Sequence, residues 1–166
     1  MVMNLTEIRR LQESMRARDW GTVYAMLDSL RDRATNQEDI ANEVYWRAIA
    51  LQRQERYDDA LAFLRENASL FNCQCLLHQM IARSLDKLGR SEDALAEMKS
   101  APIDQDMNDF YGLAMDAKFF YFYLLAKSGD QSVLNKLSEI PDDYRHITMA
   151  GKFLTKADII SLLNRS

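Results

Sequence analysis

Residues 55–67 read ERYDDALAFLREN and residues 89–101 read GRSEDALAEMKSA, so one short phrase occurs twice, thirty-four residues apart. The alignment extends beyond the phrase at the same offset. It pairs Ala48 with Ala82, Leu51 with Leu85, Asp59 with Asp93, Ala60 with Ala94 and Leu61 with Leu95. A fixed period of this length predicts that one supersecondary unit is repeated along the chain.

Each copy has the pattern of a helical hairpin. A stretch with apolar residues at helical spacing precedes a turn, and a second such stretch follows it. The expected helices are 43–54 and 58–67 in the first copy, and 75–88 and 92–100 in the second. The repeated alanines allow two helices to approach closely, and the repeated leucines fill the space beside them. At the turn, Gly89 suits the left-handed end of a helix, whereas the first copy has Glu55 there.

The composition agrees with an all-α fold and excludes several functions. The 166 residues are 48% hydrophobic, which is enough for one compact domain, and they include only five glycines and two prolines. The net charge of −4 is spread thinly, so the chain has no basic stripe for a nucleic-acid backbone. The uncharged run 119–126 is far shorter than the roughly 20 residues that a membrane span needs. Glu7, Arg9 and Arg10 stand where a signal peptide would be apolar. We therefore expect a soluble cytoplasmic protein that binds neither nucleic acid nor membrane.

The period and the phrase at 57–61 resemble the tetratricopeptide repeat, a helix–turn–helix unit of the same length. The match is good over 41–102. An irregular first hairpin over 1–36 is three residues out of phase, and a divergent hairpin over 105–140, with its turn at Gly129, is six residues out of phase. The resemblance implies a single all-α domain, in which the hairpins stack into a right-handed superhelix.

Residues 142–166 are expected to close the array, because stacked repeats need a covered end. We predict a short helix over 143–153. A final helix over 156–164 follows Thr155, which is a suitable N-cap residue. The alternative is that the last helix swings outward and forms a homodimer.

Two kinds of cluster could carry chemistry. Cys73, Cys75 and His78 suggest a zinc site, but residues two apart on a helix point about 200° away from each other, so the two thiols share a metal only if Cys73 precedes the helix. Buried thiols in a reducing compartment are the favoured interpretation, and we predict neither a metal nor a cofactor. The acidic pairs 58–59, 92–93 and 142–143 resemble acid–base carboxylates, but helix N-termini favour such charges without catalysis.

The run FFYFYLLA at 119–126 begins with five consecutive aromatic residues, which cover every side of a helix. Such a helix is either wrapped by its neighbours or presents part of its surface to a partner. Core packing is the favoured interpretation.

The resemblance also implies where a partner would bind. In tetratricopeptide proteins the first helix of each hairpin lines a concave groove. Transferred to this chain, the groove residues are Ile8, Gln12, Met15, Asn42, Tyr45, Ile49, Gln52, Leu76, Gln79, Arg83, Phe119 and Tyr123. This set is mostly apolar and amide, with one positive charge. It lacks the cationic side chains that clamp a peptide carboxylate in chaperone-binding members of the family.

We therefore expect a non-catalytic adaptor or chaperone-like module that holds an apolar or amphipathic segment of another protein. The alternative is an immunity protein or inhibitor that blocks a toxin or enzyme by tight binding, for which a small acidic helical protein is also suited. An enzyme has no positive feature in the sequence, although scattered residues could still form a site.

Overall fold

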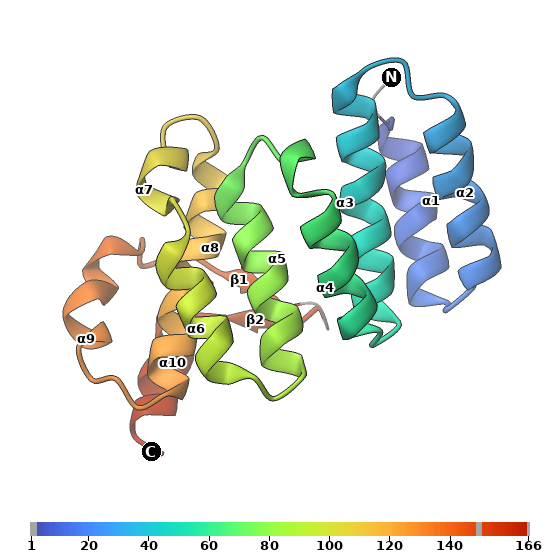
Figure 1. Cartoon of the computed structure of the whole chain (residues 1–166). Coiled ribbons are helices and arrows are strands. Elements are labelled where there is room, and N and C mark those ends of the chain that lie inside the picture. Colours follow the sequence, from blue (N-terminus) through green and yellow to red (C-terminus); the bar gives the residue numbers. More distant parts are fainter. Residues whose placement is uncertain (1–2, 149–150, 166) are drawn as a thin grey trace. The chain divides into compact units, whose positions relative to one another are not determined.

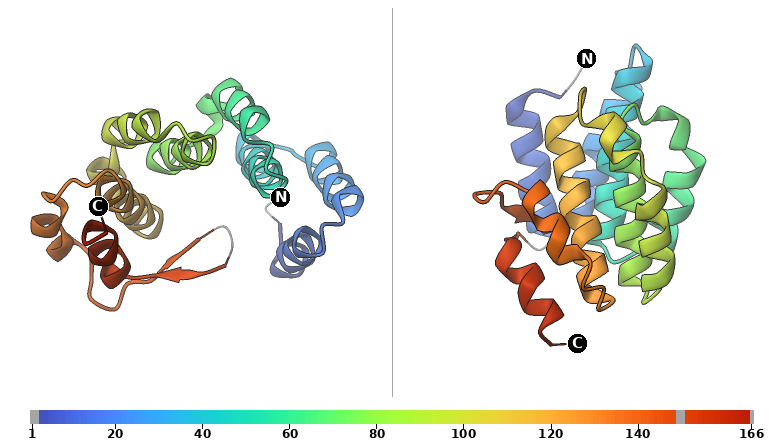
Figure 2. Two further views of the ribbon diagram at one scale, coloured as in Figure 1. Left: turned by 90° about the horizontal axis from the view of Figure 1, so that it is seen from below. Right: turned by 90° about the vertical axis from the view of Figure 1, so that its left-hand side faces the viewer.

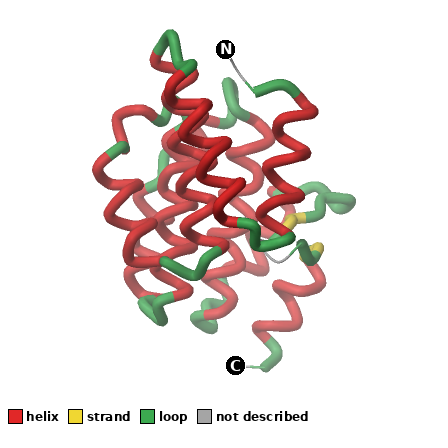
Figure 3. The backbone as a smooth tube through the Cα atoms, turned by 90° about the vertical axis from the view of Figure 1, so that its right-hand side faces the viewer, coloured by secondary structure: helices red, strands yellow, loops and turns green. Residues whose placement is uncertain are grey.

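The computed structural model describes residues 3–148 and 151–165. Within these ranges the chain is almost entirely helical, and its only strands are two short segments near the C-terminus (Figure 3). The predicted all-α fold class is therefore confirmed. The chain divides into two compact units, one ending at Asn72 and the other beginning at Cys73, and each is described by itself. None of the described helices has both the length and the apolar character that crossing a membrane requires.

The first unit contains four helices that pack in chain order, each on the next (Figure 1). They are α1 (Leu5–Arg16), α2 (Trp20–Asp32), α3 (Gln37–Arg53) and α4 (Tyr57–Glu66), followed by the short 3₁₀ helix η1 (Ala68–Leu70). Polar N-cap residues begin the first three helices. Asn4 forms a capping box with Glu7, Asp19 accepts the backbone N–H of Thr22, and Asn36 accepts that of Asp39. These caps satisfy amide groups that a helix leaves without partners at its start.

A buried carboxylate ties α2 to α3. Glu43 is almost fully buried and forms ion pairs with Arg47 on its own helix and with Arg31 of α2. Arg47 also pairs with Asp28 at 2.7 Å, and its guanidinium lies over the ring of Tyr24. The buried charge is thus compensated by two cations, which is the condition under which a core tolerates a carboxylate.

The second unit is built around α8 (Tyr111–Lys127). The helices α5 (Gln74–Lys87) and α6 (Ser91–Ser100) pack on each other, and α8 packs on both (Figure 1). The remaining elements are α7 (Ile103–Asp106), α9 (Val133–Lys136), η2 (Leu137–Glu139), β1 (His146–Ile147), β2 (Phe153–Leu154) and α10 (Lys156–Leu163).

One turn geometry recurs at four places. Arg18, Glu55, Gly89 and Gly129 all have a positive φ, and in each case the next residue donates its N–H to the carbonyl five positions earlier. This is the Schellman arrangement that ends a helix. Glu55 and Gly89 are thirty-four residues apart, and the other two are out of phase by three and six residues, as the sequence indicated. Glu55 therefore takes the conformation predicted for Gly89, although it carries a side chain.

The alanines of the repeat are fully buried. Ala48 and Ala60 lie on α3 and α4, which pack together in the first unit. Ala82 and Ala94 take the matching places on α5 and α6 in the second unit. Small side chains at these positions allow the close helix packing that the sequence predicted.

The aromatic run lies mainly in the core of the second unit. Phe119, Phe120 and Phe122 are buried, whereas Tyr121 and Tyr123 are half-buried. The core around α8 also contains Val133, Leu137, Ile140, Ile159 and Leu163, so α9, η2 and α10 wrap this helix. Core packing thus accounts for most of the run. The second helix predicted for this hairpin is only one turn, α9, and it continues as the 3₁₀ helix η2.

The short helix predicted over 143–153 is wrong. The described part of this stretch forms an antiparallel hairpin, in which His146 pairs with Leu154 and Ile147 with Phe153, and residues 149–150 lie outside the described residues. Gly151 has a positive φ and donates its N–H to the carbonyl of Thr148, which closes the turn. The β-branched side chains of Ile147 and the adjacent Thr148, and the conformational freedom of Gly151, favour a hairpin over a helix.

The final helix, α10, spans Lys156–Leu163, close to the predicted range 156–164. Thr155 forms a capping box with Asp158, and α10 then packs on α8. The left view in Figure 2 shows the hairpin leading directly into α10, which lies beside α8. The capping segment is therefore a hairpin and one helix instead of two helices. Asp142, predicted at a helix start, forms an ion pair with Lys156. The other acidic pairs, 58–59 and 92–93, do lie in the first turns of α4 and α6.

Candidate functional site

The first unit leaves part of the predicted groove face accessible. Ile8 and Gln12 on α1 are half-buried, as are Asn42 and Tyr45 on α3. Met15, Ile49 and Gln52 are buried. Asn42 and Tyr45 lie about one helical turn apart and therefore share a side of α3. They are the residues of α3 within the predicted set that expose surface to a partner.

Tyr45 is held by an aromatic neighbour. Its ring meets that of Trp46 edge to face, with 5.2 Å between the ring centroids. The side-chain amide of Asn42, in contrast, lacks one contact: its Nδ2 is buried without a hydrogen-bond partner among the described residues. A buried amide donor of this kind carries a desolvation cost of about 1–3 kcal/mol until something accepts its hydrogen.

In the second unit the predicted groove residues divide in the same way. Leu76, Arg83 and Tyr123 are half-buried, whereas Gln79 and Phe119 are fully buried. The buried members therefore contribute to the core and cannot meet a partner directly.

Gln79 and Arg83 converge on Asp116 of α8, a residue that the sequence analysis did not identify. Gln79 Nε2 donates to Asp116 Oδ2 at 2.7 Å, and Arg83 Nη2 lies 3.1 Å from the same oxygen. The other oxygen, Oδ1, accepts the hydroxyl of Tyr144 at 3.0 Å and lies 2.6 Å from His146 Nδ1. One carboxylate thus joins α5, α8 and β1. Asp116 and its four partners, Gln79, Arg83, Tyr144 and His146, form the Asp116 cluster.

His146 forms the buried side of the hairpin. Its side chain is only 3% exposed, and its ring stacks on Phe119 with 5.1 Å between centroids and 9° between planes. The ring of Phe120 also stacks on that of His146, with 6.4 Å between centroids, and the guanidinium of Arg83 lies over the Phe120 ring. These contacts hold β1 on α8, so part of the α8 surface is covered by the chain's own hairpin.

The electrostatics of the Asp116 cluster favour an ionised carboxylate. Burial alone would raise the pKa of Asp116, but the hydrogen bond and charge of His146, together with Arg83 and Gln79, outweigh it and lower this pKa to about 2. Because the carboxylate is ionised, the His146 nitrogen that faces it carries a hydrogen. The pKa of Tyr144 is raised, first by burial and then by the neighbouring negative charge of Asp116.

Gln79 also has a side-chain oxygen without a hydrogen-bond donor among the described residues. Its Oε1 is buried without a hydrogen-bond partner among the described residues, while its Nε2 is engaged by Asp116. Native proteins rarely leave buried acceptors in this state. Gln79 on α5 and Asn42 on α3 therefore each have a buried side-chain atom without a hydrogen-bond partner among the described residues.

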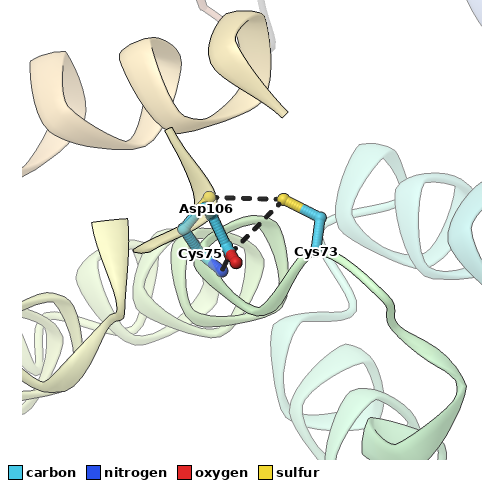
Figure 4. Close-up of side chains that lie close together, drawn as sticks. All are labelled: Cys73, Cys75 and Asp106. Atoms are coloured by element: carbon cyan, nitrogen blue, oxygen red, sulfur yellow. Dashed lines mark hydrogen bonds between the residues drawn. The ribbon is translucent and has the colours of Figure 1, made fainter. Parts of the chain in front are cut away.

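The cysteines form a second cluster, with Asp106 (Figure 4). Cys73 is the N-cap residue of α5 and so precedes the helix, and its sulfur lies 3.3 Å from that of Cys75. Asp106, at the end of α7, accepts the backbone N–H of Cys75 at 2.7 Å. His78 is not part of this group, because its Nδ1 lies 2.6 Å from a Glu97 oxygen. The predicted grouping of the cysteines with His78 is therefore not formed.

The pKa of the Cys75 thiol is raised. The causes are its hydrogen bond with Cys73, its burial, and the nearby charge of Asp106, all of which favour the protonated form. The two thiols form a short hydrogen-bonded chain that ends at the carboxylate of Asp106.

Comparison with known proteins adds no assignment: no family model, curated protein or solved structure matches this chain significantly.

Proposed function

We propose that this chain is a non-catalytic protein-binding module whose helical hairpins stack as a right-handed superhelix similar to tetratricopeptide arrays. In this proposal the first helices of the hairpins hold an apolar or amphipathic segment of another protein, and the module acts as a cytoplasmic adaptor or chaperone. The recurrence of one turn geometry at Arg18, Glu55, Gly89 and Gly129 supports the repeat. The two free thiols are of the kind that a reducing compartment preserves.

The observation that carries the proposal is the accessible side of α3. Asn42 brings a buried amide donor that lacks an acceptor, beside the half-buried ring of Tyr45. The apolar side chains of an extended or helical segment would pack on the tyrosine, and a carbonyl of the segment would accept the Asn42 hydrogen once the half-buried side chain turns its amide outward. Binding would thus remove a desolvation cost that the free protein carries.

The chemistry of the Asp116 cluster does not suit acid–base catalysis. Its carboxylate already accepts hydrogen bonds from Gln79 and Tyr144 and pairs with Arg83 and His146. A general base needs a free lone pair directed at substrate, and a general acid needs a proton that it can release near neutral pH. An acid with a pKa of about 2 that is engaged on both oxygens suits neither role, so the cluster is structural in this proposal.

Four tyrosines allow a matched test by photo-crosslinking in the native host. Tyr45 and Tyr123 lie on the first helices α3 and α8, whereas Tyr24 and Tyr57 lie on the second helices α2 and α4, and all four are half-buried. Each would be replaced singly by a photoreactive phenylalanine analogue, and folding would be verified by circular dichroism. We expect a partner to be captured at Tyr45 and Tyr123 and not at Tyr24 or Tyr57.

Mass spectrometry of the crosslinked product would then locate the captured segment. The proposal requires a segment with apolar residues at helical or extended spacing. Equal capture at the second-helix tyrosines, or capture only of an acidic tail, would contradict it. Ile49→Asp is unsuitable for this test, because Ile49 is 8% exposed and a buried charge there would unfold the protein.

A further inference from the structure

Two sulfurs and a carboxylate meet at the start of α5. The ligand atoms of Cys73, Cys75 and Asp106 all lie within 4.8 Å of one another. Both cysteines are buried, with exposed fractions of 5% and 0%, and the carboxylate comes from a separate helix, α7. Figure 4 shows the three side chains close together, with dashed lines joining the two sulfurs and joining the Cys73 sulfur to the Asp106 carboxylate.

Local backbone geometry brings the two sulfurs together. Cys73 has an extended conformation, with φ −92° and ψ 100°, and α5 begins only at the following residue. The chain direction therefore changes between the cysteines, so the angle of about 200° that separates side chains two apart on a helix does not apply. This removes the geometric objection to a shared metal that the sequence alone raised.

Asp106 is held in place by the backbone. Its Oδ2 accepts the N–H of Cys75 at 2.7 Å and lies 3.7 Å from the sulfur of Cys73. A hydrogen bond from the main chain fixes the carboxylate orientation, as outer contacts do for the ligands of known metal sites. The position of the Asp106 carboxylate is therefore fixed by the main chain of α5 and not by a contact with another flexible side chain.

The spacing suits a tetrahedral ion. Bonds of about 2.3 Å to sulfur and about 2.0 Å to oxygen place two sulfurs about 3.8 Å apart, and sulfur and oxygen about 3.5 Å apart. The corresponding separations here are 3.3 Å and 3.7 Å. The Cys75 sulfur and the Asp106 oxygen lie within 4.8 Å of each other, so movements of about an ångström would bring all three atoms to bonding distance.

The electrostatics favour thiolates once an ion is bound. Both cysteines lie at the N-terminus of a fourteen-residue helix, whose partial positive charge stabilises nearby anions. Binding would release the two thiol protons to solvent, and two thiolates and one carboxylate would face a doubly charged cation. The net charge of the occupied site would be −1, which the helix end offsets in part.

We propose that Cys73, Cys75 and Asp106 bind a thiophilic divalent cation of the zinc class, with water in a fourth position. The ion would fasten α7 to the start of α5. This site is independent of the partner-binding face, and its test does not require a partner.

The test uses full-length protein purified in reductant without a histidine tag, then titrated with cobalt chloride and, separately, with zinc sulfate. We expect one cobalt ion per chain and a thiolate-to-cobalt charge-transfer absorption, which zinc abolishes by displacement. Zinc should also raise the melting temperature. His78→Gln serves as the control, because His78 lies on the same helix but pairs with Glu97. It should leave the absorption unchanged.

Two variants test the assignment of ligands. Cys73→Ser should abolish the charge-transfer absorption, and Asp106→Asn should weaken cobalt binding at least tenfold, because the amide keeps an acceptor for the Cys75 N–H but loses the charge. The second variant keeps the test valid if the first folds poorly. Absence of the absorption in the wild-type protein, or an unchanged titration in Asp106→Asn, would overturn the site.

Discussion

Replacing Asp116 by asparagine isolates the contribution of the Asp116 cluster to stability. Asparagine keeps the shape of the side chain but removes the charge that faces His146 and Arg83. Burial opposes the ionised form and these partners favour it, and the balance lowers the pKa of Asp116 from 3.8 to about 2. One pKa unit corresponds to about 1.4 kcal/mol, so the ionised carboxylate contributes about 2 kcal/mol to the free energy of unfolding. The side chain is 29% exposed, which makes this value an upper bound.

The pH dependence follows from the direction of the shift. The folded pKa lies below the unfolded one, so the stabilisation is fully present above about pH 4 and is lost as the pH falls through about 2. The free energy of unfolding of the wild-type protein should therefore exceed that of Asp116→Asn by more at pH 5 than near pH 2. Other carboxylates with lowered pKa values, such as Glu7 and Asp19, titrate in both proteins and cancel in the difference.

Urea unfolding monitored by circular dichroism at several pH values between 5 and 2 measures this difference directly. We expect the advantage of the wild-type protein over Asp116→Asn to shrink by about 2 kcal/mol across the range. A constant difference would show that the charge of Asp116 adds no stability, and would refute the reasoning about His146 and Arg83.

Three further predictions concern packing, turns and caps. Phe119→Ala should lower the free energy of unfolding by about 3–5 kcal/mol because Phe119 is fully buried, whereas Leu134→Ala, at an exposed position, should change it by less than about 0.5 kcal/mol in the same urea assay. Gly89→Ala should destabilise by about 1 kcal/mol because Gly89 has a positive φ, whereas Gly112→Ala, in open space in α8, should raise the melting temperature; equal effects of the two would contradict the turn geometry. Thr155→Ala removes a capping box and should cost about 1 kcal/mol by thermal melting, and an unchanged melting temperature would argue against that cap.

The helical hairpins could be predicted because their signals are local. The spacing of apolar residues, the repeated alanines and a glycine such as Gly89 act within a few residues of where they stand, so the sequence indicates helices and turns together. The turn at Glu55 was less well signalled, and only the alignment with Gly89 indicates that it takes the same conformation.

The C-terminal hairpin and the Asp116 cluster could not be predicted in the same way. His146 is buried because it contacts Asp116 and Phe119, which lie about thirty residues earlier in the chain. Such long-range contacts produce no periodic pattern in the sequence. The signal for the Asp116 cluster was Asp116 itself, the one carboxylate in the mostly apolar stretch 113–122, since a buried charge requires partners. Ile147 and Thr148 with Gly151 were the signals for a hairpin.

The cysteine cluster could be predicted only in part. By sequence, the two thiols can share a metal only if Cys73 precedes the helix, and Cys73 does so as the N-cap residue of α5. The carboxylate of Asp106 comes from α7, and its approach to Cys75 depends on how two helices pack. A ligand set drawn from two elements is therefore visible only in three dimensions.

The central claim is that the Asn42 and Tyr45 side of α3 binds a segment of another protein. The most direct measurement is the affinity of the crosslinked segment, as a synthetic peptide, for Tyr45→Ala and for the control Tyr24→Ala, with the melting temperature of both variants verified. Loss of an aromatic anchor costs about 2 kcal/mol or more, so Tyr45→Ala should bind about thirtyfold more weakly while Tyr24→Ala matches the wild-type protein. Equal affinity of the peptide for all three proteins would contradict the claim.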